Sequence, residues 1–344
     1  MSDPSRPIVL ARIRPGSNAS RPHRLLRAVS VAAALASFLL IAVGALVRAT
    51  KSGEGCPGWP KCFGRFVPPF THHPGVTLEH ALIEYSHRLT ATVVFVLVVA
   101  VALVAWRRYR TTPRVFRPAV LGLALWLFQA VLGGLVVKFG LPAWLVTAHL
   151  ATAMVFAGTL IFMVVAAFSV DVTVSGPVDE LTRLAWAGAA ATLGLIVVGG
   201  LVRGEGAGLA FVDWPLMAGK VVPYLGALRP ALMFAHRVLA VLVFGLVAMV
   251  AVRGLRARTT RRPAAVLAVA AAVLFSGQIL IGAANVWTRL AVGPVVAHVT
   301  VAALIWGTLV ATAAASRACA CKWEPAEASS PAVPATGAPV KVGR

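Results

Sequence analysis

Eight long apolar runs constrain this chain more than any other feature of its sequence. Each is long enough to cross the hydrocarbon core of a bilayer as a helix, which takes about 20 mostly apolar residues. The runs do not alternate between apolar and polar residues, as the spans of a membrane β-barrel would. We therefore predict an all-α integral membrane protein with eight transmembrane helices. The runs cover residues 28–47, 81–105, 118–137, 143–168, 183–202, 230–252, 264–284 and 291–315.

The composition excludes an ordinary water-soluble protein. Hydrophobic residues make up 59% of the 344 residues and charged residues 12%, against about 45–50% and about 25% in soluble domains. The net charge of +21 could suggest a nucleic-acid partner, but the basic residues form short clusters between the apolar runs. Such clusters are typical of orientation signals in membrane proteins. We expect a multi-pass protein of the cell membrane that binds no nucleic acid.

The positions of the basic clusters predict the orientation. They lie before the first run, after the second run and after the sixth run, and the positive-inside rule places all three in the cytoplasm. With eight spans, both termini are then cytoplasmic. The predicted organisation is a disordered basic tail (1–27), a four-helix bundle (28–168), a cytoplasmic linker (169–182), a second four-helix bundle (183–315) and a disordered tail (316–344).

The two halves of the chain repeat one another. The segment from Gly44 to Arg48 returns as residues 199–203 at a shift of 155, and Trp59-Pro60 returns at the same shift. Beyond the first outer loop the shift falls to 149, because the second outer loop is shorter. Each half contributes four helices, an even number, so both halves share one orientation. This indicates a parallel repeat about an axis along the membrane normal.

Four histidines lie within the first two turns of the second, fourth, sixth and eighth predicted helices: His87, His149, His236 and His298. In each half, 62 residues separate the two histidines. All four should lie at one depth near the outer face, where ionisable residues inside a membrane indicate function. Two facing imidazoles in an apolar bundle suit haem iron, whereas zinc would need further ligands. We predict two haem sites, His87/His149 and His236/His298.

Four arginines near the outer face could pair with the anionic propionates of these haems, although long basic side chains also extend to the interface without any ligand. These arginines form two matched pairs across the repeat. They are Arg48, Arg88, Arg203 and Arg237.

The two halves differ at Glu84, whose counterpart is Met233. Glu84 precedes His87 by three residues, so both face one side of the same helix, and a carboxylate inside a membrane indicates a functional site. Cys56 and Cys62 lie in the first outer loop, where a disulfide is sterically possible and the compartment is oxidising; whether it is structural or redox-active is left open. We assign no role to a further group: His72, His73, His80, Cys319 and Cys321.

Together these motifs resemble the haem A synthase family over residues 28–315. One departure is Gly58, where the family usually has Asp before Trp-Pro. Another is the second outer loop, which lacks the cysteine pair that some bacterial members carry. The motifs are Gly44-Ala-Leu-Val-Arg48 with Ser52-Gly53, Cys56-Pro57-Gly58-Trp59-Pro60 with Cys62, Glu84-Tyr85-Ser86-His87-Arg88, Asp213-Trp214-Pro215 and His236-Arg237.

The resemblance implies an oxidoreductase that converts the C8 methyl of haem O into the formyl group of haem A. Members are thought to hydroxylate the methyl twice, with water as the oxygen source. The resemblance places the substrate on His87/His149, a haem b cofactor on His236/His298 and Glu84 beside the reacting methyl as the catalytic residue. It also implies partners: the haem O synthase (protohaem farnesyltransferase), cytochrome oxidase assembly and a membrane electron acceptor. A homo-oligomer is possible.

Two other classes of protein fit parts of the sequence. A di-haem cytochrome b that carries electrons from quinol is equally compatible with the composition and the histidines. Glu84 in one half only, and the Cys56/Cys62 loop, argue against it. A transporter or haem chaperone on a parallel repeat would need a polar path to the inner face, yet the polar intramembrane residues cluster at the outer level.

Overall fold

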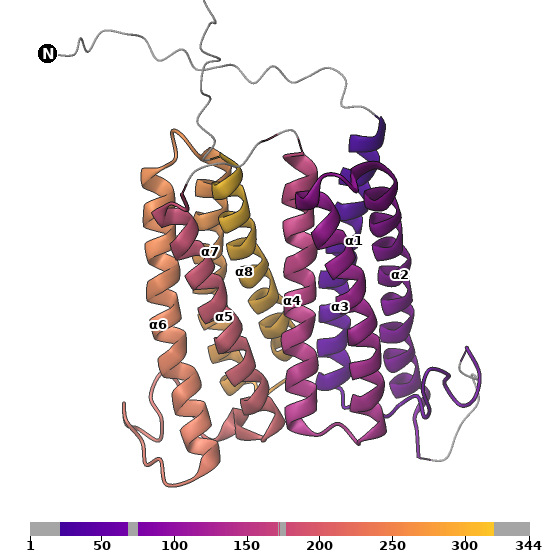
Figure 1. Ribbon diagram of the computed structural model, residues 1–344. Coiled ribbons are helices and arrows are strands. Elements are labelled where there is room, and N and C mark those ends of the chain that lie inside the picture. Colours follow the sequence, from indigo (N-terminus) through magenta and orange to yellow (C-terminus); the bar gives the residue numbers. More distant parts are fainter. Residues whose placement is uncertain (1–20, 68–74, 171, 173–176, 320–344) are drawn as a thin grey trace, which may run out of the picture.

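The computed structural model describes residues 21–67, 75–170, 172 and 177–319 (Figure 1). These residues form eight helices long and apolar enough to cross a membrane, and within the described ranges there is no strand longer than an isolated bridge. The predicted fold class is therefore confirmed. The elements are α1 (Arg21–Ala49), α2 (Leu78–Tyr109), α3 (Pro113–Lys138), α4 (Ala143–Phe168), α5 (Glu180–Gly204), a short 3-10 helix (Ala207–Leu209), α6 (Leu228–Arg256), α7 (Arg262–Trp287) and α8 (Val292–Cys319).

Four helices form the centre of the bundle. Helices α4 and α8 contact each other and both α1 and α5, whereas α2 and α3 pack on one side of this group and α6 and α7 on the other. Figure 1 shows the first four helices in one half of the molecule and the last four in the other. The matched contacts α1 with α8 and α5 with α4 agree with the repeat in the sequence, because α1 corresponds to α5 and α4 to α8.

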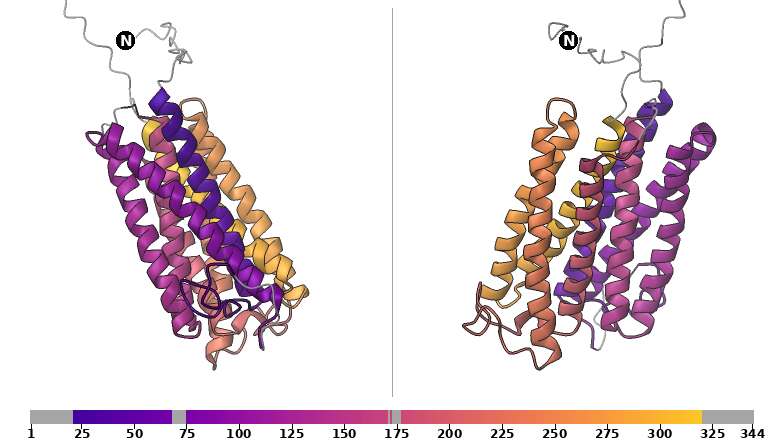
Figure 2. Two further views of the ribbon diagram at one scale, coloured as in Figure 1. Left: turned by 90° about the vertical axis from the view of Figure 1, so that its right-hand side faces the viewer. Right: turned by 60° about the vertical axis from the view of Figure 1, so that its left-hand side comes forward.

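Both halves run in the same direction. The start of α1, the α4–α5 connection and the end of α8 lie at one end of the bundle, and the loops after α1 and α5 lie at the other (Figures 1 and 2). We call the end with these long loops the outer end and the opposite end the inner end. Which of the two faces the cytoplasm stays a prediction.

The centre of the molecule depends on two glycines at matched positions of the repeat. Gly158 of α4 faces the ring of Trp306 on α8, so closely that a Cβ there would overlap the indole. Its counterpart Gly307 faces Phe38 of α1, and a built Cβ would lie 2.7 Å from the Cζ atom of that ring. Small residues of this kind let helices approach closely in membranes. Here they let one large aromatic ring pack between α4 and α8 and another between α8 and α1.

Helix α1 begins earlier than the sequence predicted, at Arg21 rather than at residue 28. The physical reason is tertiary packing. Leu26 is completely buried in the core of the first half, and the Arg27 side chain donates a hydrogen bond of 3.1 Å to the Ala167 carbonyl of α4. Residues 21–27 of the predicted tail therefore lie in α1; the rest of the tail lies outside the described residues.

The last helix is likewise longer than predicted. Helix α8 continues to Cys319 because Ser316 is buried and accepts hydrogen bonds of 3.1 Å from both Thr182 and Arg261. Helix α5 also starts inside the predicted linker, at Glu180, where the Asp179 carboxylate accepts a hydrogen bond of 2.9 Å from the Thr182 N–H as an N-cap. The predicted boundary at 168/169 coincides with the end of α4 at Phe168, whereas the helix start predicted at 183 lies at Glu180. Residues 320–344 lie outside the described part of the chain.

Ion pairs join two connections at the inner end. Asp179 pairs with Arg261, and Glu180 pairs with Arg253 over 3.1 Å. These acidic residues are the exception in an otherwise basic inner end, and the structure pairs each of them with a basic residue from the α6–α7 region. The exposed Glu180–Arg253 pair contributes about 0–1 kcal/mol, so it orients the connection more than it stabilises the fold.

Candidate functional site

The structure brings the four predicted histidines into two equivalent settings near the outer end. In the first half His87 lies on α2 and His149 on α4; in the second half His236 lies on α6 and His298 on α8. All four side chains are partly buried. In each of them the Nδ1 atom is buried without a hydrogen-bond partner among the described residues. A buried polar atom without a partner is unusual in proteins, and its recurrence at all four histidines indicates a common role.

A glycine of the neighbouring helix lies against each imidazole. A Cβ built on Gly44 of α1 would lie 3.1 Å from Cε1 of His87, and one on Gly133 of α3 would lie 3.2 Å from Cε1 of His149. The second half repeats this arrangement, with 3.1 Å for Gly199 against His236 and 3.5 Å for Gly282 against His298. In both bundles, therefore, two helices supply histidines and the other two supply the small residues that leave room for them.

The second pair of histidines has the spacing of two ligands on one metal ion. The ring centroids of His236 and His298 are 6.5 Å apart, and the ring planes are inclined at 61°. Two metal–nitrogen bonds of about 2 Å each fit within this distance, with the rest taken up by the rings. In the part of the chain that the structure describes, no group of three or more His, Cys, Asp or Glu could hold a metal. Paired imidazoles with unpartnered Nδ1 atoms and glycine-lined walls fit the two axial positions of a haem.

The glycines allow a test of this geometry. We expect Gly199→Ala to weaken haem retention in the second half, because the new methyl would push the His236 ring by a few tenths of an ångström. Such overpacking typically costs about 1–3 kcal/mol. Gly282→Ala should have the smaller effect, since a Cβ 3.5 Å from His298 is an ordinary contact. Haem content per chain of the two purified variants measures the difference; equal retention in both would contradict the proposed role of Gly199.

Two glutamines on neighbouring helices bind the backbone of the helices that carry His149 and His298. Gln129 of α3 donates a hydrogen bond of 2.9 Å to the His149 carbonyl, and Gln278 of α7 donates one of 2.8 Å to the His298 carbonyl. Thr152 donates to the Gln129 carbonyl oxygen, whereas the corresponding oxygen of Gln278 is buried without a partner within the described residues. These glutamines fix the distance between neighbouring helices at the level of the histidines.

Sequence reasoning missed Asn285, which lies on the same helix as two residues that contact His298, Gln278 and Gly282. It is nearly buried on α7, and its Oδ1 atom has no hydrogen-bond partner in the described ranges. Gln278, Gly282 and Asn285 are spaced by four and three residues and so share one helix face. Its counterpart in the first half is Val136, and an amide that replaces an aliphatic residue inside a span was the signal that could have revealed it.

Glu84 is buried on α2, one turn outward of His87. Its side chain is 6% exposed, and its Oε1 atom accepts a hydrogen bond of 3.1 Å from Nε of Arg88. The corresponding place in the second half is apolar: Met233 packs with Phe211 and Met217 in a small cluster of its own. The predicted difference between the two halves is therefore a buried ion pair in one and an apolar contact in the other.

The first outer loop contains the predicted disulfide between Cys56 and Cys62, with Cα atoms 4.8 Å apart and both residues buried. The residues at the matched positions of the second loop are Phe211 and Met217. Both loops have a cis Trp-Pro bond and a short antiparallel bridge, so their backbones follow similar paths. The disulfide joins two positions of the first loop, and the residues at the matched positions of the second loop, Phe211 and Met217, belong to one apolar cluster.

The departure from the family pattern at Gly58 goes together with a different set of contacts in the two outer loops. It has φ of +86°, a conformation that favours glycine over aspartate. In the second loop Asp213 accepts hydrogen bonds of 2.8 Å from the N–H groups of Gly219 and Ala218, which hold the pKa of this carboxyl below its usual range. The first loop is therefore closed by its disulfide. The second loop is closed by an aspartate that accepts hydrogen bonds from two backbone N–H groups.

The four predicted propionate-binding arginines fall into two groups. Arg88 and Arg237 donate hydrogen bonds to carbonyls of the outer loops, which gives them a role in holding these loops. Arg48 and Arg203 come from the two halves and are close enough to repel one another electrostatically. The Arg203 Nε atom is buried with no partner in the described ranges. Arg48 and Arg203 thus have the most donors left for an anionic group, and propionate binding stays a prediction.

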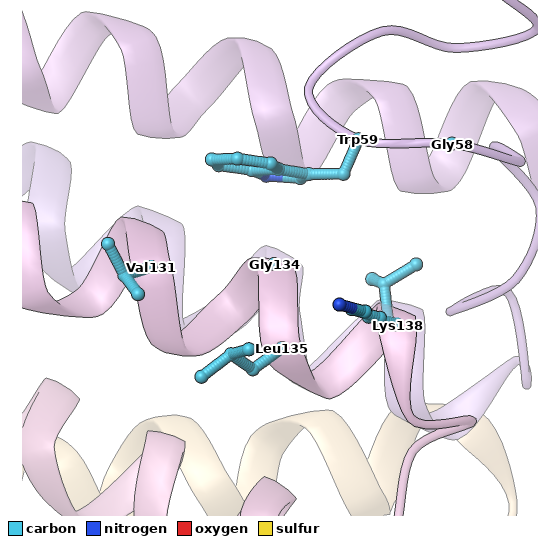
Figure 3. Close-up of a pocket in the computed structure, with 7 residues that line it drawn as sticks. Gly58, Trp59, Val131, Gly134, Leu135 and Lys138 are labelled. Atoms are coloured by element: carbon cyan, nitrogen blue, oxygen red, sulfur yellow. The ribbon is translucent and has the colours of Figure 1, made fainter.

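A cavity of about 450 Å³ lies between the first outer loop and the outer end of α3 (Figure 3). The Trp59 ring covers it and lies against Gly134, where a Cβ would approach to 3.1 Å. Val131, Leu135 and Lys138 line the wall. In the second half Trp214 instead meets Trp287 edge-on at 5.7 Å. Since Gly133 faces His149 and Gly134 faces this cavity, the two sites occupy adjacent sides of one helix.

The residues left without a role in the sequence acquire little from the structure. The His80 N–H donates a hydrogen bond of 3.3 Å to the N-cap Thr77, so its backbone serves the start of α2. Cys319 is the last residue of α8. His72, His73 and Cys321 lie outside the described residues.

The fold and the histidines define a class: a multi-pass membrane protein built from two related helical bundles, each with a histidine pair suited to haem. Comparison with known proteins identifies the family. The family model described as cytochrome oxidase assembly protein matches residues 27–310, and the chain belongs to this family.

Curated relatives carry the name heme A synthase. The protein from Shouchella clausii is 29% identical over 272 residues, covering 77% of this chain and 88% of the relative. The one from Halalkalibacterium halodurans is 28% identical over 240 residues, covering 68% and 78%. A Bacillus cereus relative is 29% identical over 227 residues, covering 64% and 71%.

Proposed function

We propose that this protein is a haem A synthase, an oxidoreductase that converts the C8 methyl group of haem O into a formyl group. One observation carries the proposal beyond the family. Of two histidine sites that match in helix, glycine contact and depth, only the first has a buried carboxylate among the described residues, Glu84. A pure electron carrier has no need of this difference, whereas an enzyme with one reactive and one auxiliary haem does. The names of the curated relatives support the same activity.

Each half has its own part in the proposal. His87 and His149 would bind the substrate haem O beside Glu84, and His236 and His298 would bind a haem b cofactor beside Met233. When bound, haem b would supply one-electron transfer between the substrate site and an acceptor in the membrane. The apolar cluster of Met233, Phe211 and Met217 lies where the first half has its carboxylate, and the lack of an acid–base group at Met233 suits an electron relay.

The overall reaction requires water and an electron acceptor. In the proposed sequence the methyl is hydroxylated twice, each time with one water molecule and with release of two electrons and two protons. The resulting gem-diol then loses water to give the formyl group. Glu84 would accept a proton or stabilise positive charge that develops at the reacting carbon, and a site of low dielectric strengthens such a charge interaction. The four electrons would pass to an acceptor in the membrane, and haem b held by His236 and His298 would supply the one-electron transfer.

Partners are implied by the substrate and the product. A protohaem farnesyltransferase must supply haem O, and a terminal oxidase under assembly would consume haem A. These partners remain part of the proposal, as does a homo-oligomeric state.

The test is a haem analysis of cells that make haem O but no haem A. The full-length chain is expressed in them, and the extracted haems are separated by chromatography and identified by absorbance. We expect haem A to appear only with this chain. If the protein is folded and loaded with haem yet yields only haem b and haem O, the synthase proposal is wrong and the di-haem electron carrier takes its place.

A further inference from the structure

The Arg88 guanidinium connects the buried carboxylate to the disulfide loop. Its Nε donates to Glu84 Oε1 at 3.1 Å, its Nη1 to the carbonyls of Gly58 and Lys61 at 2.9 and 3.1 Å, and its Nη2 to the Cys56 carbonyl at 2.9 Å. Arginine has five N–H donors in a rigid plane, so these four bonds fix its orientation almost completely. The side chain is only 16% exposed.

The second half provides an internal comparison. Arg237 donates to the carbonyls of Asp213 and Leu216, which correspond to Gly58 and Lys61 at the shift of 155. Both arginines therefore bind their outer loop in the same way. At the other two contacts the halves differ, because Arg237 lies over the Phe211 ring, 5.9 Å from its centroid, and has Met233 in place of a carboxylate one turn before it on the helix. The contacts to Cys56 and Glu84 are additional to the shared loop-binding role.

We infer that Arg88 is the positioning residue for Glu84: it aims the carboxylate, and the disulfide-closed loop holds Arg88 in turn. The inference rests on the proposed function of Glu84. A glutamate side chain has three rotatable bonds, and the single hydrogen bond from Arg88 restrains the last of them. Because three loop carbonyls bind Arg88, the position of the Glu84 carboxylate is restrained through Arg88 by the loop. A catalytic group misplaced by 1 Å can lose about 10²-fold in rate.

The disulfide belongs to the same arrangement. The carbonyls of Cys56, Gly58 and Lys61 all lie within the segment that the Cys56–Cys62 bond closes. Opening this ring would leave the Arg88 and Glu84 side chains unchanged while it loosens the groups that hold them. Reduction of the disulfide should therefore disturb Glu84 in the same sense as a change at Arg88, and less strongly.

Arg88→Lys in the full-length, haem-loaded protein tests the inference. Lysine keeps the positive charge but cannot bind one carboxylate and three carbonyls in a plane. We expect kcat for haem A formation to fall roughly 10²-fold, with KM and haem b content little changed. A second readout is independent of turnover: the infrared carboxylate band that disappears in Glu84→Gln should shift in Arg88→Lys. The Cys56→Ser/Cys62→Ser variant should shift the same band by a smaller amount, and it serves as the test if Arg88→Lys does not fold.

Two further variants separate positioning from a structural role. Arg237→Lys measures the effect of losing a loop contact alone, and Arg229→Lys, whose side chain binds only the Glu205 carbonyl at 2.9 Å in the described structure, is the outer-end control with unchanged kcat. An unshifted band and wild-type kcat in Arg88→Lys would overturn the inference, as would equal losses of kcat in Arg88→Lys and Arg237→Lys. If the wild-type protein makes no haem A, but Arg88→Lys still shifts the Glu84 carboxylate band, the proposed function is refuted and the positioning role of Arg88 stands.

Discussion

Glu84→Gln should abolish haem A formation while the protein still folds and binds both haems. Glutamine keeps the shape of the side chain and an oxygen that can accept the hydrogen bond from Arg88, so the local structure is preserved. What the substitution removes is the negative charge and the basic oxygen. Loss of an acid–base group typically costs 10²–10⁴-fold in rate, so we expect turnover to fall by about 10²-fold or more. The measurement is the ratio of haem A to haem O extracted from the purified variant.

The matched control is Glu79→Gln. Glu79 lies on the first turn of the same helix and is exposed, so this variant makes the same chemical change outside the site. It should turn over haem O at the wild-type rate. Wild-type turnover in Glu84→Gln would remove this carboxylate from the mechanism, and the difference between the two halves would then need another explanation. A loss of haem from Glu84→Gln would point instead to a structural role for the ion pair with Arg88.

His236→Ala should empty the second site of haem b. The imidazole is one of only two side chains placed to bind iron there among the described residues, with its ring centroid 6.5 Å from that of His298. Substitution of a residue that hydrogen-bonds to a metal ligand already costs about 10–100-fold in metal affinity. Loss of the ligand itself should therefore weaken haem binding by more than that. We expect haem b content to fall to a small fraction of the wild-type value, and haem A formation to stop with it, because the electrons lose their exit. Absorbance of the purified protein and quantification of the extracted haem measure the effect.

His23→Ala is the control for this substitution. His23 lies at the inner end on α1 and packs edge-on against Tyr109, with centroids 5.8 Å apart. Its loss should leave haem b content unchanged. A His236→Ala protein that retains wild-type haem and its spectrum would refute the ligand assignment, and an equal loss in both variants would indicate general destabilisation.

The residues proposed to carry the chemistry were visible in the sequence because they break a local rule. Histidine and glutamate are costly inside a membrane, so His87, His149 and Glu84 stand out from apolar runs without any knowledge of the fold. The repeat then paired them with His236, His298 and Met233. Asn285 breaks the same rule and was missed, because the predicted span ended at residue 284, whereas the helix continues to Trp287.

The boundaries and the arginine contacts depended on the tertiary structure. Helix α1 extends back to Arg21 because Leu26 packs into a core that includes α2 and α4 residues, and no local pattern contains that contact. From the sequence, Arg88 and Arg237 carried the same prediction as Arg48 and Arg203. Only the folded outer loops, which return to the helices more than 20 residues away in the chain, show that Arg88 and Arg237 bind loop carbonyls.

The sequence by itself determined the number of spans, the internal repeat and the two histidine pairs, because the cost of polar groups in lipid acts on each residue separately. It could not determine how the helices meet. These helices are apolar almost all round, so no polar face marks which side turns inward. Their neighbours were decided by close approach at small residues: Gly158 against Trp306 at the centre, and glycines against histidines in each bundle. Such contacts are between residues far apart in the chain, and only the tertiary structure places them together.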